Sequence, residues 1–124
     1  MREIKFRGKS IVTGEWCFGD LFQHGDQKFI MANNRNTEVD PETVGQYTGL
    51  RDMDSKEIYE GDIIQTYDPD EGYAVVRYDE TETEFYTLFV SENSYYGLGR
   101  DFNSEDIAVV GNIYDNPELV GEQS

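Results

Sequence analysis

The chain has 124 residues, of which ten are Lys or Arg and 26 are Asp or Glu, so its formal net charge at pH 7 is −16. This length fits one domain, or one domain built from two small lobes, and it permits a core that needs neither disulfides nor a structural metal. The charge argues against direct nucleic-acid binding, because that affinity comes from neutralising phosphates.

The negative charge lies almost entirely in the second half of the chain. Residues 1–50 carry six Lys or Arg and seven Asp or Glu, a balance of −1, whereas residues 51–124 carry four and nineteen, a balance of −15. Net charge affects solubility and association more than it affects the fold. The simplest interpretation is therefore a solvated, solubilising surface.

Cysteine usage and hydrophobicity predict a cytoplasmic protein. Cys17 is the single cysteine, which excludes an intramolecular disulfide and a Cys-based zinc cluster and favours a reducing compartment. Residues 1–7 are charged and alternating, unlike a secretion signal, and nowhere does the sequence contain the eighteen or so apolar residues of a membrane span. We expect no membrane association.

Short apolar segments with a two-residue period, bounded by Gly, Asn, Asp and Pro, indicate strands and turns. Residues 32–42 are polar and predict a loop with, at most, one helical turn beginning at Pro41. Residues 1–44 thus predict an N-terminal β meander. Its expected strands are 3–7, a strand from Trp16 that includes Phe18, and the segments 21–22 and 29–31 on either side of a turn at 24–26.

Residues 45–124 predict a second lobe of short strands. Residues 107–114 also fit helical spacing, but Gly111 and the β-branched side chains favour a strand. Turn signals every eight to twelve residues favour an all-β fold, with a small SH3-like barrel or roll in this lobe, over a parallel α/β sheet. The expected strands are 44–50, 57–59, 63–67, 73–79, 81–90 and 107–114.

A central motif resembles a known family. The runs 46–52 (QYTGLRD) and 56–64 (KEIYEGDII), together with the opening 2–7 (REIKFR) and the closing 110–119 (VGNIYDNPEL), are similar to the YopX family of phage and prophage proteins. The resemblance spans the chain, although residues 66–106 carry no family motif. It implies an SH3-like β fold, self-association and no established biochemical function, and it carries over no catalytic residue.

The motif residues predict structural roles. Gly49 and Gly61 supply turn conformations that other residues resist, and Asp52, Asp54 and Asp62 suit hydrogen bonding within turns. Large apolar side chains such as Ile63 and Ile64 are expected to pack around these turns. The motif residues are Gln46, Tyr47, Thr48, Gly49, Leu50, Ile58, Tyr59, Glu60, Gly61 and Asp62.

The sequence predicts no catalytic, cofactor or metal site. The pairs Asp52/Asp54 and Asp68/Asp70 suggest calcium, but neither is followed by the glycine at position six and the glutamate at position twelve of a calcium loop. His24 is the single histidine, which excludes a His-based metal cluster within one chain. Cys17 has apolar neighbours, a setting that disfavours the nucleophilic thiolate.

Two surfaces are candidates for binding. Tyr95, Tyr96 and Arg100 combine aromatic anchors with a Gly-containing loop, and Tyr and Arg are favoured at binding hot spots; a tyrosine that covers one end of the barrel is an equally good interpretation. The second candidate is a set of carboxylates that we expect to be exposed in two neighbouring hairpin loops: Asp70, Glu71, Glu80, Glu82 and Glu84.

Three functional hypotheses follow. The first is a noncatalytic, phage-encoded interaction module that self-associates in the bacterial cytoplasm. An edge strand in the basic first ten residues, which carry Arg2, Lys5, Arg7 and Lys9, is expected to dock onto an acidic surface of its own chain or of a neighbour. The second is an acidic decoy that occupies the basic nucleic-acid groove of a host or phage enzyme. The third, which has the least support, is a small carboxylate-based hydrolase.

Overall fold

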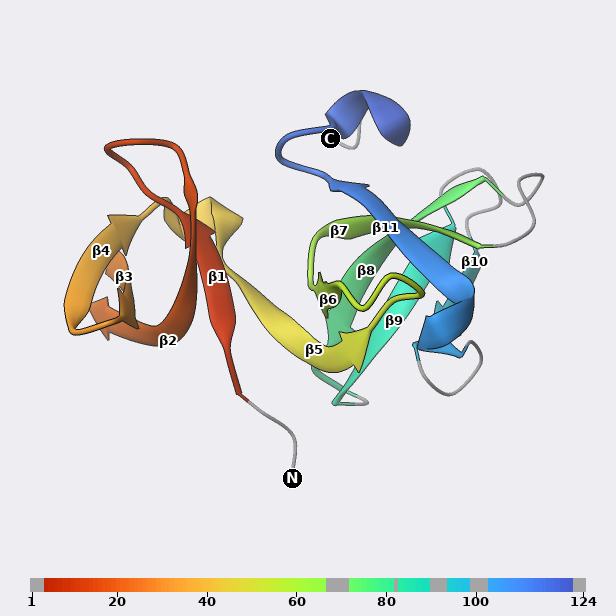
Figure 1. Cartoon of the computed structure of the whole chain (residues 1–124), viewed down its shortest axis with the longest axis horizontal. Coiled ribbons are helices and arrows are strands. Elements are labelled where there is room, and N and C mark those ends of the chain that lie inside the picture. The colour runs from red at the N-terminus through yellow and green to blue at the C-terminus, as the bar shows by residue number, and fades with distance from the viewer. Residues whose placement is uncertain (1–3, 67–71, 82, 90–93, 99–102, 122–124) are drawn as a thin grey trace. The chain divides into compact units, whose positions relative to one another are not determined.

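The computed structural model describes residues 4–66, 72–81, 83–89, 94–98 and 103–121, with the backbone alone at 94 and 95. It confirms the all-β prediction, because the described elements are antiparallel strands joined by turns and short 3-10 helices. The chain divides into two compact units, Met1–Gly49 and Leu50–Ser124 (Figure 1). This boundary lies inside a strand, five residues beyond the boundary inferred from the sequence.

The first unit is an antiparallel meander with the strand order β4-β3-β2-β1-β5. The strands β1 to β4 pair consecutively, whereas β5 pairs with β1 through Phe6–Gln46 and Arg7–Gly45. Its elements are β1 (Phe6–Lys9), β2 (Trp16–His24), β3 (Gln27–Ala32), β4 (Arg35–Val39), the 3-10 helix η1 (Pro41–Thr43) and β5 (Gly45–Arg51).

The meander curls until its two sides meet. An isolated antiparallel bridge joins Ser10 to Val39, and the Asp40 N–H donates to the Lys9 carbonyl at 2.8 Å. The close approach requires glycine, because a Cβ atom at Gly8 would lie 2.9 Å from two carbon atoms of Val39. A Cβ atom at Gly19, on β2, would collide with the backbone of β3. Among the apolar side chains of this sheet, Ile30 and Val39 are fully buried.

The sequence predicted a loop for the polar segment 32–42, and this prediction is wrong. Asn33 and Asn34 both have positive φ, at 53° and 63°, which is the backbone of a tight two-residue hairpin and a conformation that Asn tolerates. They return the chain directly into β4. The single helical turn at Pro41 is confirmed as η1, where an Asp40 Oδ1 atom accepts from the Glu42 N–H at 3.1 Å.

The second unit contains a five-stranded antiparallel sheet with the order β10-β9-β8-β7-β11. The short strand β6 also belongs to this unit, but it pairs with β5 at the end of the other sheet. The elements of this unit are β6 (Glu57–Tyr59), β7 (Asp62–Thr66), β8 (Tyr73–Asp79), β9 (Glu84–Phe89), β10 (Ser94–Gly97), η3 (Ser104–Asp106), β11 (Ile107–Asn112) and η4 (Pro117–Leu119).

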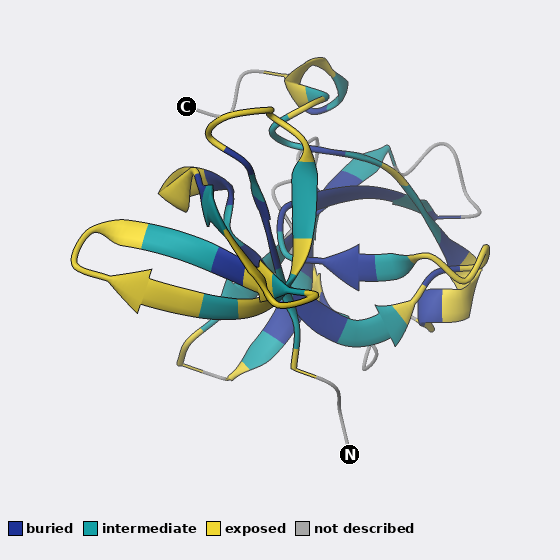
Figure 2. Cartoon of the chain, turned by 60° about the vertical axis from the view of Figure 1, so that its left-hand side comes forward, coloured by how far each residue is buried: buried dark blue, intermediate teal, exposed yellow. Residues whose placement is uncertain are grey.

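The sheet of the second unit is covered on both faces at its centre. Ile63 and Ile64 are successive residues of β7, so they point to opposite faces, and both are fully buried. Figure 2 shows dark blue, buried ribbon along the central strands and yellow at turns. One cluster contains Ile58, Ile64, Ala74, Val76, Phe85, Phe89 and Ile107, and the other contains Ile63, Val75 and Val120.

Two strand boundaries differ from the sequence prediction. The strand expected from residue 81 begins at Glu84, because the Thr81 N–H donates to an Asp79 Oδ1 atom at 2.9 Å and Thr83 has a φ of 52°, so these residues form a turn. Side chains alternate along the strand, since Phe85, Thr87 and Phe89 are buried and the residues between them are half-buried. β11 is a strand, as expected, but it ends at residue 112. The SH3-like assignment stays a prediction.

Candidate interaction surfaces

The Asp52 carboxylate of the central motif closes one turn and fixes one strand. It is 3% exposed. Its Oδ1 atom accepts hydrogen bonds from the N–H groups of Asp54 and Lys56, at 2.8 and 2.9 Å, while its Oδ2 atom accepts from the Val109 N–H of β11 at 2.8 Å. A single side chain thereby joins the turn after β5 to a strand 57 residues away in sequence. Asp54 contributes its backbone N–H to this turn.

The turn at Gly61 is a second junction of the motif. Gly61 has a φ of 93°, its N–H donates to the Val76 carbonyl at 2.8 Å, and its carbonyl accepts from the Ile113 N–H at 3.0 Å. The next residue, Asp62, is buried and accepts from the Tyr59 N–H at 2.8 Å. The other large motif side chains, Tyr47, Ile58 and Tyr59, are buried. At these positions the motif side chains are buried or accept hydrogen bonds within turns.

The structure places one of the three residues of the predicted aromatic surface. Tyr96 is 39% exposed, and its ring meets the buried ring of Phe89 edge-on, with centroids 5.7 Å apart. This contact is what we expect of a tyrosine that covers the core, and the role of Tyr96 in binding a partner stays a prediction. The Tyr95 side chain and Arg100 lie outside the residues that the structure describes.

Of the five predicted surface carboxylates, the structure describes two. Glu80 is exposed in the turn between β8 and β9, whereas Glu84 is half-buried and pairs in register with Asp79 across those strands. Asp70, Glu71 and Glu82 lie outside the described part of the chain. The acidic surface as a whole therefore stays a prediction, although Glu84 is less exposed than expected.

The basic strand does not have the free edge that the sequence suggested. β1 lies between β2 and β5, so both of its backbone edges are paired. Its cations pack on rings: Arg7 lies 4.5 Å and Lys9 5.4 Å from the Trp16 ring centroid, and Lys5 lies 5.3 Å from that of Tyr47. Arg7 is only 6% exposed. The expectation of an edge strand here is thus wrong, because alternation in one strand does not show which strands will flank it.

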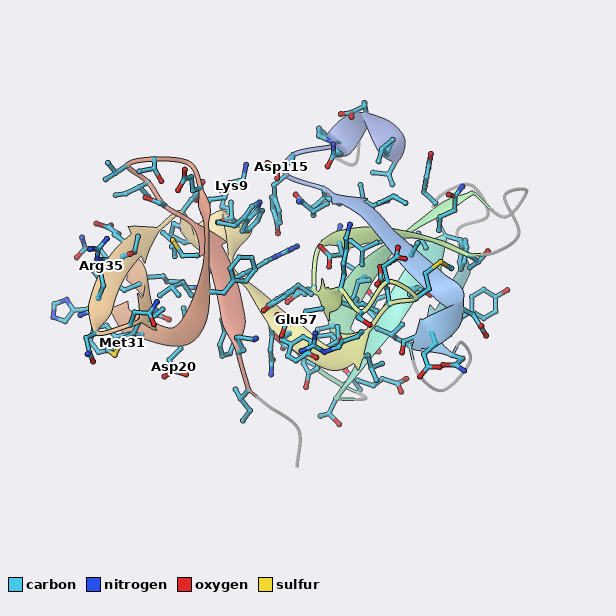
Figure 3. The ribbon with its side chains drawn as sticks, in the orientation of Figure 1. Lys9, Asp20, Met31, Arg35, Glu57 and Asp115 are labelled. Atoms are coloured by element: carbon cyan, nitrogen blue, oxygen red, sulfur yellow. The ribbon has the colours of Figure 1, made fainter. Side chains whose placement is uncertain are left out.

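A surface that the sequence analysis did not single out lies on the outer face of β2 and β3. Phe22 and Met31 are 46% and 42% exposed, and the Phe22 ring lies 6.1 Å from that of its cross-strand partner Phe29. Met31 pairs with Asp20, and Figure 3 labels both side chains. We call Phe22, Phe29 and Met31 the outer patch. A sequence signal exists, since these positions keep the two-residue period, but the period does not tell which face is buried.

The inner face of the same sheet contains a cavity of about 540 Å³, which we call the inner pocket. Register places Ile30 opposite Thr37 and Ala32 opposite Arg35, so these four lining residues share one face of the sheet. In the described part of the chain, the Arg35 side chain makes no hydrogen bond or ion pair. The lining residues are Cys17, Phe18, Ile30, Ala32, Asn33, Arg35 and Thr37.

The described residues contain neither a metal-binding cluster nor a membrane-spanning helix. No group of three or more His, Cys, Asp or Glu side chains is arranged there to hold a metal ion. None of the helices described there has the length and apolar character needed to cross a bilayer.

The comparisons with known proteins give the family. The YopX protein family model matches residues 2–121. The chain belongs to the YopX family. Among solved structures, this YopX protein is similar to the crystal structure of protein EF1440 from Enterococcus faecalis, with a TM-score of 0.57 and 19% identity over 97% of this chain and 99% of that chain. At this identity the likeness concerns the fold alone. A search of curated proteins finds no match.

Proposed function

We propose that this YopX protein is a noncatalytic, phage- or prophage-encoded interaction module that acts in the bacterial cytoplasm and self-associates through the outer patch. The observation that carries the proposal is the exposure of Phe22 and Met31 side by side with Phe29 on an ordered sheet. Contiguous exposed apolar side chains on a soluble protein mark interaction sites, and Phe and Met are enriched in interface cores.

The occupant that we propose is a second copy of the same chain. The outer patch belongs to residues 1–49, which carry a balance of −1, whereas residues 50–124 carry −15. Contact between two first units therefore buries apolar surface with little charge repulsion, while contact between two second units opposes like charges. Two sheet faces pack about 10 Å apart with interdigitating side chains, and an isologous contact of this kind places each copy's patch on the other's.

Light scattering coupled to size-exclusion chromatography tests the proposal. The wild type is expected to have an oligomeric mass, and the double variant Phe22→Ser/Met31→Ser is expected to be monomeric at the same concentration, because the apolar centre of the contact is lost. The matched control is Val110→Ser, a change of an exposed apolar side chain on β11 of the second unit. It should leave the mass unchanged. Circular dichroism checks that each variant is folded.

Ionic strength separates this mechanism from docking between opposite charges. An apolar contact between two strongly acidic chains should strengthen as salt is added, since screening shortens the repulsion to about 8 Å near 0.15 M. Docking of cations onto carboxylates should weaken instead. A wild type that stays monomeric at every accessible concentration, or a double variant that keeps the oligomeric mass, would contradict the proposal.

A further inference from the structure

The inner pocket has the size and the mixed lining of a small-molecule site. Its volume of about 540 Å³ lies within the range of about 300–1,000 Å³ that is typical of ligand sites. Ile30 is fully buried beneath it, and Ala32 adds a second apolar wall. Cys17 and Phe18 of β2 also line it. The polar lining residues on β4 and on the β3–β4 turn, which we call the polar rim, are Asn33, Arg35 and Thr37.

The polar rim presents donors to a single anionic group. Arg35 is exposed and, within the described residues, its guanidinium has no protein acceptor. Thr37 stands two residues further along β4, so its hydroxyl faces the same side. Asn33 supplies a side-chain amide from the turn. A guanidinium can bind a carboxylate through two parallel N–H donors, with hydrogen bonds stronger than those between neutral groups.

We propose that the inner pocket binds a small monocarboxylate with an apolar body. The carboxylate pairs with Arg35 at the rim, and the apolar body lies against Ile30 and Ala32. The charge balance favours a monoanion over a phosphate or a polyanion, because Arg35 is the one cationic residue among the lining side chains and the whole chain carries −16. A second negative charge would have no partner on the described rim.

This inference does not depend on self-association. The lining residues Ile30, Arg35 and Thr37 lie on the inner face of the sheet, whereas Phe22 and Met31 lie on the outer face, since side chains alternate along each strand. A failure of ligand binding and a failure of oligomerisation would therefore be observed in separate experiments and with separate variants.

Titration with 4-phenylbutyrate and with its neutral analogue 4-phenylbutanol tests the proposal, by calorimetry and by chemical-shift changes in amide NMR spectra. The wild type is expected to bind the carboxylate saturably and the alcohol more weakly, with shifts centred on β3, β4 and their turn. Arg35→Gln should weaken carboxylate binding about tenfold to a hundredfold and leave alcohol binding unchanged, as expected for the loss of a hydrogen bond between charged groups. Thr37→Val should weaken it about twofold to tenfold.

Arg77→Gln is the matched control, because it removes the same charge from β8 in the second unit. It should bind 4-phenylbutyrate like the wild type. The proposal is overturned if the wild type binds acid and alcohol equally or binds neither, or if the Arg35 and Arg77 variants lose the same affinity. The comparison of the two ligands on the wild type needs no variant, so it decides the question even if Arg35→Gln fails to fold.

Discussion

The Asp52 carboxylate provides the sharpest test of how the family motif stabilises the fold. In Asp52→Asn, the amide oxygen can keep the place of the Oδ1 atom and accept from Asp54 and Lys56. The amide nitrogen then faces the Val109 N–H, which at present donates to the Oδ2 atom at 2.8 Å. One hydrogen bond to a charged acceptor is lost, and two donors oppose each other at a site that is 3% exposed.

The expected loss follows from these contacts. A hydrogen bond to a charged group contributes about 1.5–3 kcal/mol, and an unsatisfied buried donor costs about 1–3 kcal/mol. Because the turn can relax, we expect the free energy of unfolding of the second unit to fall by about 2–4 kcal/mol. The matched control is Asp54→Asn, two residues away on an exposed side chain, for which we expect a change within about 0.5 kcal/mol.

Urea denaturation measures both variants. Far-ultraviolet circular dichroism follows both sheets, whereas fluorescence of Trp16, the single tryptophan, reports on the first unit. A lower midpoint with an unchanged slope indicates lost stability rather than a changed unfolded state. If the Asp52 variant unfolds at the same urea concentration as the Asp54 variant, the carboxylate is not the junction that the geometry describes, and the reasoning is refuted.

Two other predictions concern the curled sheet and the charge. Gly8→Ala should lower the stability of the first unit by about 1–3 kcal/mol, measured by Trp16 fluorescence in urea, because the added Cβ atom overlaps Val39. The control Gly25→Asn should have little effect, since no atom beyond the adjacent residues lies within 4 Å of a Cβ atom in that turn. Equal losses of stability in the two variants would contradict this account. The wild type should not retard duplex DNA in a gel at physiological ionic strength, because its net charge of −16 repels phosphates, and a retarded band would count against the charge argument.

Local features of the fold were predictable where one segment determines its own structure. The 24–26 turn of the β2–β3 hairpin and the strand at 107–112 follow from turn residues and β-branched side chains. The prediction of a loop at Asn33–Asn34 is wrong, because these two residues with positive φ make a hairpin turn. The polar residues of β4 show no alternation that separates a strand from a loop.

The candidate surfaces could not be predicted because they depend on pairing between strands. The alternation of Lys5, Arg7 and Lys9 shows that they share a face, but only the register with β2 and β5 shows that Trp16 and Tyr47 cover them. The inner pocket likewise requires three strands and a turn to be brought together. The sequence predicted Tyr and acidic side chains as binding residues because of their residue types. Exposure and strand register indicate binding surfaces in the first unit instead.

The two proposed binding properties depend on one feature of the first unit, which is the register of its curled sheet. A shift of one residue along a strand would exchange its inner and outer faces, so Phe22 would enter the pocket side and Ile30 would reach solvent. Gly8 and Gly19 oppose such a shift, because each stands at a point where a neighbouring strand leaves no room for a side chain. Substitutions on the faces should therefore remove one property at a time, whereas substitution of either glycine should remove both.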